Sequence, residues 1–166
     1  LPNNYGATPV YIAAQEGHEE TVRVRAELGA CVKTANDNGT TPVCAAAQEG
    51  HVETVRALAE LGACFKTPKN DGATPVFIAA QEGHEETVRV LAELGACVKT
   101  AKKNGTTPDC AAAQEGHVET ERALAELGAR FQKLHNNGTT PFSIAAQRGT
   151  EETDRAPAEP TPCVKT

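Results

Sequence analysis

One dipeptide recurs along the chain at a constant interval of 33 residues. Thr-Pro occurs five times, with its proline at 9, 42, 75, 108 and 141. Fixed periods of this length indicate a solenoid, in which each unit buries its apolar face only against its neighbours. The sequence therefore predicts one elongated domain over residues 1–166. Its repeats are expected at about 3–35, 36–68, 69–101 and 102–134, with a partial repeat at 135–166.

The signals within one repeat predict two helices separated by turns. In the second repeat an Asn-Gly turn precedes Thr41, a suitable N-cap, and Pro42, a suitable first helical residue. A short helix, VCAAAQE, follows and is expected to end at Gly50. A longer helix is expected at about 52–61, with Gly62 as its C-terminal stop. Each repeat is thus turn, short helix, turn and longer helix, which makes an all-α fold.

This pattern resembles the ankyrin repeat. The family motif T-P-L-H-x-A-A has counterparts here in TPVYIAA, TPVCAAA, TPVFIAA, TPDCAAA and TPFSIAA. The resemblance covers essentially the whole chain and implies a solenoid of helix-turn-helix units with short β-hairpin-like loops. One position departs from the family, because its His is replaced by Tyr11, Cys44, Phe77, Cys110 or Ser143. That departure puts in question the hydrogen bond that this His makes between hairpins.

A second histidine position follows the short helix in four repeats, at His18, His51, His84 and His117. Stacked helices lie about 10 Å apart, whereas zinc–nitrogen bonds are about 2 Å long, so these histidines cannot share one metal. The resemblance to ankyrin repeats implies instead that each Gly-His bonds backbone between the two helices of its repeat. No CxxC, Walker, GxSxG or HExxH motif occurs. We therefore expect no enzyme, no cofactor and no metal site.

The six cysteines are not spaced for disulfides. Cys31, Cys64 and Cys97 recur at the repeat interval, so stacking separates them by more than the roughly 7 Å between Cα atoms that a disulfide allows. Cys44 and Cys110 are two repeats apart. We expect these cysteines to be small side chains that are buried or half-buried. Free thiols indicate a reducing, intracellular compartment, with the cytoplasm as the default.

Composition restricts the core and the partners. Aromatic residues make up 4% of the chain and Trp and Met are absent, so the core must consist of Ala, Val, Leu and Ile in thin layers. A net charge of −6 argues against nucleic acid as a partner. No apolar run approaches the roughly 18 residues that a membrane span needs, so membrane insertion is not expected. Because the chain starts at Leu1, we expect a fragment, a processed chain or part of a longer protein.

The resemblance places partner contacts at the hairpin tips and on the inner face of the short helices. Four inner-helix positions carry a glutamate, and these carboxylates are expected to form a row at about 10 Å intervals. Such a row could attract a basic segment of a partner protein; alternatively, it only keeps the solenoid soluble. The candidate binding residues are Tyr5, Asp37, Asn38, Asn70, Asp71, Lys103 and Asn104 at the tips, and Gln15, Glu16, Gln48, Glu49, Gln81, Glu82, Gln114 and Glu115 on the helices.

Several core positions carry a charge. Arg25 stands where other repeats have Leu, and Asp109, Glu121 and Asp154 stand where they have Val. A buried unpaired charge costs several kcal/mol, so each must reach water, find a partner or loosen its helix. Prolines at 157, 160 and 162 fall where the last long helix should run, so the final repeat is expected to be half built.

The features together predict a non-catalytic protein-interaction module, a scaffold or adaptor. Two alternatives stay open: a structural or linker subunit held inside a larger assembly, and a regulatory repeat segment of a longer protein. An adaptor is expected to be a soluble monomer that binds reversibly. An assembly subunit is expected to be unstable or prone to aggregation when alone.

Overall fold

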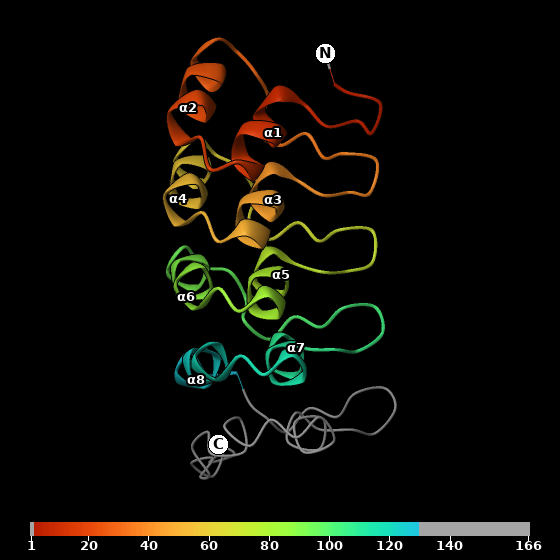
Figure 1. Ribbon diagram of the computed structural model, residues 1–166, viewed down its shortest axis with the longest axis vertical. Coiled ribbons are helices and arrows are strands. Elements are labelled where there is room, and N and C mark those ends of the chain that lie inside the picture. The colour runs from red at the N-terminus through yellow and green to blue at the C-terminus, as the bar shows by residue number, and fades with distance from the viewer. Residues whose placement is uncertain (1, 130–166) are drawn as a thin grey trace.

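The computed structural model describes residues 2–129, which form a stack of four two-helix repeats (Figure 1). No strand occurs in this range. The expected all-α solenoid is confirmed, whereas the partial fifth repeat, Asp154 and the prolines of the C-terminal segment lie outside the described residues. The helices are α1 (Pro9–Gln15), α2 (Glu19–Glu27), α3 (Pro42–Glu49), α4 (Val52–Glu60), α5 (Pro75–Glu82), α6 (Glu85–Glu93), α7 (Pro108–Glu115) and α8 (Val118–Glu126).

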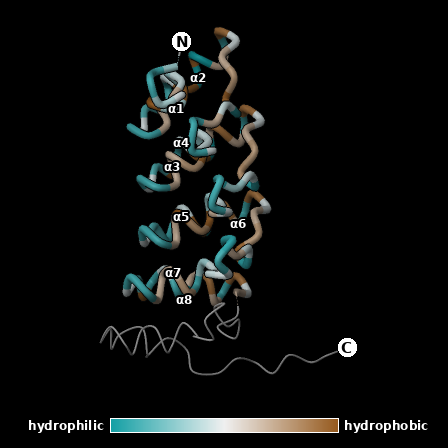
Figure 2. Tube along the Cα trace, turned by 90° about the vertical axis from the view of Figure 1, so that its right-hand side faces the viewer, coloured by the Kyte–Doolittle hydropathy of each residue, from teal (hydrophilic) through white to brown (hydrophobic). Residues whose placement is uncertain are grey.

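The helices form two layers. The short helices α1, α3, α5 and α7 stack in one column, the longer helices α2, α4, α6 and α8 stack beside them, and the hairpin loops project to one side (Figure 1). Each helix contacts its repeat partner and the equivalent helix of a neighbouring described repeat. The same succession of hydrophilic and hydrophobic stretches recurs from repeat to repeat (Figure 2).

The short helices begin as the sequence predicts. Thr41 has an extended backbone, and its hydroxyl oxygen accepts a hydrogen bond from the backbone N–H of Cys44 at 3.3 Å. Pro42 follows at the first helical position, where no N–H is needed. Thr8 and Thr74 cap their helices in the same way. Thr107 keeps the extended backbone but makes no such hydrogen bond.

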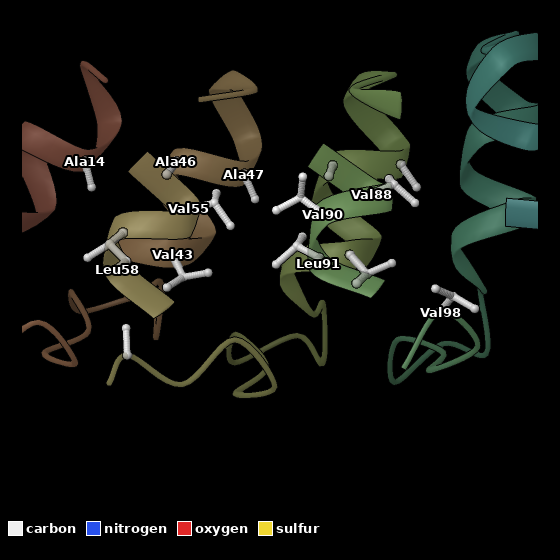
Figure 3. Close-up of a cluster of buried hydrophobic side chains, with 14 of the residues drawn as sticks. Ala14, Val43, Ala46, Ala47, Val55, Leu58, Val88, Val90, Leu91 and Val98 are labelled. Atoms are coloured by element: carbon white, nitrogen blue, oxygen red, sulfur yellow. The ribbon is translucent and has the colours of Figure 1, made fainter. Parts of the chain in front are cut away.

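The core lies between the two layers and consists of small aliphatic side chains, as expected. Alanines such as Ala46 come from the short helices, and Val55 and Leu58 come from the longer ones (Figure 3). Helix α4 ends at Glu60, one residue before the predicted boundary, and Leu61 is the half-buried capping residue. Because the core side chains are small, adjacent helices can approach closely.

The charged residues at core positions have two different outcomes. Arg25 is exposed, because α2 lies at the N-terminal end of the described stack and no described repeat covers it. Its counterpart in the third repeat, Leu91, is fully buried. Asp109 and Glu121 remain buried, at 2% and 1% exposure, in the regular helices α7 and α8. Both interact with neighbouring groups, so they meet the expectation of finding a partner.

Ion pairs connect the longer helices across repeat boundaries. Arg23 pairs with Glu60 of the next repeat at 2.9 Å. The equivalent pairs, Arg56 with Glu93 at 3.3 Å and Arg89 with Glu126 at 2.8 Å, continue the series. Exposed pairs of this kind contribute only about 0–1 kcal/mol each. They recur with the same offset between neighbouring long helices of the described stack.

Candidate functional site

The hairpin loops owe their shape to side chains within each loop. In the second repeat the backbone N–H of Asn36 donates to Thr40 O at 2.9 Å, and that of Gly39 donates to Asn36 O at 2.9 Å. The side-chain oxygen of Asn36 accepts two further bonds, from Asn38 N and Thr40 N, both at 3.0 Å. Asn3 has the same role in the first repeat.

In the third and fourth repeats lysine replaces this asparagine. The side chain that accepts the hydrogen bond within the loop is then that of a predicted site residue, Asp71 or Asn104. The carboxylate of Asp71 accepts from Ala73 N at 3.0 Å, and the side-chain oxygen of Asn104 accepts from Thr106 N at 3.0 Å. Asp71 also pairs with Lys102 at 2.9 Å. These two candidate residues therefore stabilise their own hairpins, a role that Asn3 and Asn36 have in the first two repeats.

The structure brings the predicted tips of successive repeats together. One backbone hydrogen bond, 3.2–3.3 Å long, joins each tip to the next, and all six residues involved are candidates. Their side chains are exposed, and the phenol of Tyr5 is the most exposed large hydrophobic group there, at 75%. The donors and acceptors are Asp37 N to Tyr5 O, Asn70 N to Asn38 O, and Lys103 N to Asp71 O.

The short helices present the predicted Gln-Glu pairs at their C-terminal ends. Glu16, Glu49, Glu82 and Glu115 are all exposed, whereas Gln114 is half-buried and the other three glutamines are exposed. The row of glutamates passes close to Tyr11, which is near Glu49. Burial, followed by the neighbouring Cys44 and the charge of Glu49, raises the pKa of the Tyr11 phenol.

The histidines position this row. The backbone N–H of His51 donates to Ala46 O of α3 at 2.9 Å, and His51 O accepts from Val55 N of α4 at 3.0 Å. The bond between the two helices that the family resemblance implies is thus confirmed. The ring also reaches the preceding repeat, where Nε2 lies 3.0 Å from Gln15 O. Because a carbonyl oxygen only accepts, Nε2 donates this bond.

The same ring contact recurs in the next two repeats, from His84 to Gln48 O at 2.9 Å and from His117 to Gln81 O at 3.0 Å. Sequence reasoning missed this link between repeats. The available signal was the Gly-His pair at every 33-residue step, since the glycine leaves room for the next histidine. A Cβ added at Gly50 would lie 2.6 Å from Nδ1 of His84.

Two of the described cysteines are buried as expected, and three are not. Cys44 and Cys110 are buried, as expected, and burial raises the pKa of both thiols. Cys31, Cys64 and Cys97 are exposed, so the expectation of burial was wrong for them. Each follows an alanine, three residues after the end of the long helix, whose backbone N–H donates back to a carbonyl of that helix. A hydrogen bond with the Thr67 side chain, and then one with Lys66 backbone, lowers the pKa of the Cys64 thiol.

Neither a metal site nor a membrane-spanning helix is found in the described residues. Within 2–129, no group of three or more His, Cys, Asp or Glu side chains is arranged to hold a metal ion. None of the helices in that range has the length and apolar character that crossing a membrane requires.

These observations define a helical-repeat protein with a continuous exposed surface, in which histidine rings and hairpin tips form hydrogen bonds from one repeat to the next. The family model described as ankyrin repeats, in three copies, matches residues 27–102. The structure continues the same two-helix unit on both sides of that range. Residues 27–102 are thus ankyrin repeats. A search of curated proteins found no match. Ankyrin repeats are generally protein-interaction modules without catalytic activity.

Proposed function

We propose that this protein is a non-catalytic scaffold or adaptor that binds a partner protein through its hairpin tips and the inner face of its short helices. One observation carries the proposal. The tips and, apart from the half-buried Gln114, the Gln-Glu pairs expose their side chains while hydrogen bonds between repeats hold their backbones. A surface ordered before binding loses less conformational entropy when a partner docks.

The charge of the inner row indicates the kind of partner. Four exposed carboxylates follow one another along the stack, at Glu16, Glu49, Glu82 and Glu115. A basic segment of a partner, laid along the row, would meet several of them at once. Such complementarity mainly accelerates association and selects among partners, and it weakens as salt rises.

The test compares two variants with the same change in net charge. The first replaces the four row glutamates by alanine, and the control replaces four exposed glutamates of the longer helices: Glu20, Glu53, Glu86 and Glu119. A partner captured by the parent from native extract is identified by mass spectrometry and then titrated calorimetrically. We expect the row variant to lose affinity and the control to retain it. Equal affinity in both, with equal helix content by circular dichroism, would contradict the assigned surface.

A second candidate, a structural or linker subunit of a larger assembly, is favoured by the N-terminal end of the stack. Ile12, Val24 and Leu28 are 43%, 47% and 77% exposed there. In the third repeat the counterparts of the first two, Ile78 and Val90, are buried at 7% and 2%. A neighbouring subunit could cover this end. Light scattering separates the candidates: the adaptor is expected to be monomeric at all concentrations, and the subunit to associate as concentration rises.

A further inference from the structure

The lysines of the described chain collect in one kind of segment. All six lie in the loops that follow the longer helices, whereas every arginine in residues 2–129 lies on a longer helix. The loops at 63–74 and 96–107 together hold five lysines and one acidic residue, Asp71. This surface is strongly basic although the whole chain has a net charge of −6. The five lysines are Lys66, Lys69, Lys99, Lys102 and Lys103.

A cavity of about 530 Å³ lies between these two loops and is here called the loop groove. Its apolar lining includes Phe65 and Pro68 from the first loop and Val76 from α5. Lys66, Lys102 and Lys103 also line it. Binding sites for small molecules and side chains commonly have volumes of about 300–1,000 Å³, so the groove has the size of a binding site.

The groove depends on two residues that distinguish the second repeat from the first and the third. Phe65 occupies the position of Val32 and Val98, which are buried at 7% exposure. The phenylalanine ring is only half-buried, so part of it remains available in the groove. Pro68 replaces the alanine found at this position in the first and third repeats and restricts the backbone there. In a chain of near-identical repeats, this is a local departure that enlarges the exposed apolar surface.

Part of the positive charge around the groove is unneutralised. Lys102 pairs with Asp71 at 2.9 Å, and its Nζ also lies 5.1 Å from the centre of the Phe77 ring. Lys66 lies 6.0 Å from the centre of the Phe65 ring, and Lys103 is exposed. Within residues 2–129, the pair with Asp71 is the only ion pair that a lysine lining the groove makes. Two cations therefore flank an apolar surface without a carboxylate partner.

We propose that the loop groove binds an acidic peptide segment of a partner protein that carries one apolar side chain. The apolar side chain packs against Phe65 and Pro68, and flanking carboxylates pair with Lys66 and Lys103. The observation that selects this occupant is charge complementarity: cations surround an apolar surface on an otherwise acidic protein. This site shares Lys103 with the hairpin tips of the proposed function but uses none of the Gln-Glu pairs, and it selects a partner segment of opposite charge.

The test uses a fluorescein-labelled peptide of alternating Glu and Asp around a central Leu, followed by fluorescence anisotropy on the full chain. Three variants are measured beside the parent. Lys66→Glu combined with Lys103→Glu reverses the flanking charge, and Phe65→Val installs the residue that the neighbouring repeats have at this position. The control Lys33→Glu reverses the equivalent lysine of the preceding loop, outside the groove.

We expect the charge-reversal variant to weaken binding by at least about tenfold and Phe65→Val by about fivefold, while Lys33→Glu stays within about twofold of the parent. Replacing the central Leu of the peptide by Ser should reproduce the loss seen with Phe65→Val. Absence of binding to the parent, equal losses in Lys33→Glu and the charge-reversal variant, or unchanged binding by Phe65→Val would each overturn the proposal. Complete displacement of the peptide by equimolar ATP would overturn it too, because it would show a site for small anions.

The variant lacking the four row glutamates separates this proposal from the proposed function. It retains the loop groove, so it is expected to bind the acidic peptide with parental affinity. If it instead lost the peptide while the charge-reversal variant kept it, the acidic segment would be bound elsewhere and the loop groove would be excluded.

Discussion

The contact between Gly50 and the next histidine makes a quantitative prediction about how repeats are held together. Gly50 has φ of +75°, a conformation that costs a residue with a side chain about 1–2 kcal/mol. A Cβ there would also lie 2.6 Å from Nδ1 and 2.9 Å from Cε1 of His84. Gly50→Ala therefore introduces two separate costs, one in the backbone and one against the ring.

A second glycine isolates the backbone cost. Gly62 has φ of +82°, and a Cβ added there would meet nothing within 4 Å. Gly62→Ala is therefore expected to reduce the free energy of unfolding by about 1–2 kcal/mol. Gly50→Ala should cost about 1–2 kcal/mol more, because displacing the His84 ring breaks its 2.9 Å bond to Gln48 O and exposes part of the interface between repeats.

Urea unfolding followed by far-ultraviolet circular dichroism measures these free energies. A double-mutant cycle completes the test, since in a His84→Ala background the extra cost of Gly50→Ala should disappear and leave only the backbone cost. If Gly50→Ala were no more destabilising than Gly62→Ala, or if its cost were unchanged without the histidine, the steric coupling across the repeat boundary would be refuted.

Three further outcomes are expected. Asp109→Val combined with Glu121→Val should raise the free energy of unfolding by about 1–4 kcal/mol, because the equivalent Val76 and Val88 are fully buried and no carboxylate then needs to be desolvated; urea unfolding checks this, and a loss of stability would contradict it. Iodoacetamide at pH 7.5 should alkylate Cys64 much faster than Cys44. The lowered pKa of the exposed Cys64 thiol enlarges its thiolate fraction, whereas burial raises the pKa of the Cys44 thiol. Mass spectrometry of timed samples measures the two alkylation rates, and equal rates would contradict the prediction. Arg89→Ala should cost no more than about 1 kcal/mol, and less in 0.5 M salt, since its ion pairs are exposed; a larger loss in thermal unfolding would contradict it.

Much of the fold was predictable because local chemistry determines it. Thr41 and Pro42 specify a helix start and Gly50 a helix end through interactions that span only a few residues. The period of 33 residues then specified the stack. Thr107 shows the limit of this reasoning, since the same Thr-Pro signal lacks the side-chain bond there.

The candidate site was predicted less completely. The exposure of the tips and of the glutamate row followed from their place in the repeat. The ring contact of His51 with the preceding repeat did not, because it depends on how two units are offset when stacked. Likewise Cys64 looked small enough for the core, but its exposure depends on the direction of the chain after the helix. The loop groove requires two loops, about 30 residues apart in sequence, to lie side by side.

The links between repeats have a mechanical consequence. The ring bonds of the histidines, the backbone bonds between hairpin tips and the ion pairs of the long helices each connect a repeat to the one beside it. Under tension applied at its ends, such a chain releases one repeat at a time. Each 33-residue repeat adds about 110 Å of extended chain when it detaches, at about 3.4 Å per residue. The end-to-end length of the protein would therefore increase in discrete, equal steps, and its length at each stage would depend on how many repeats remain stacked.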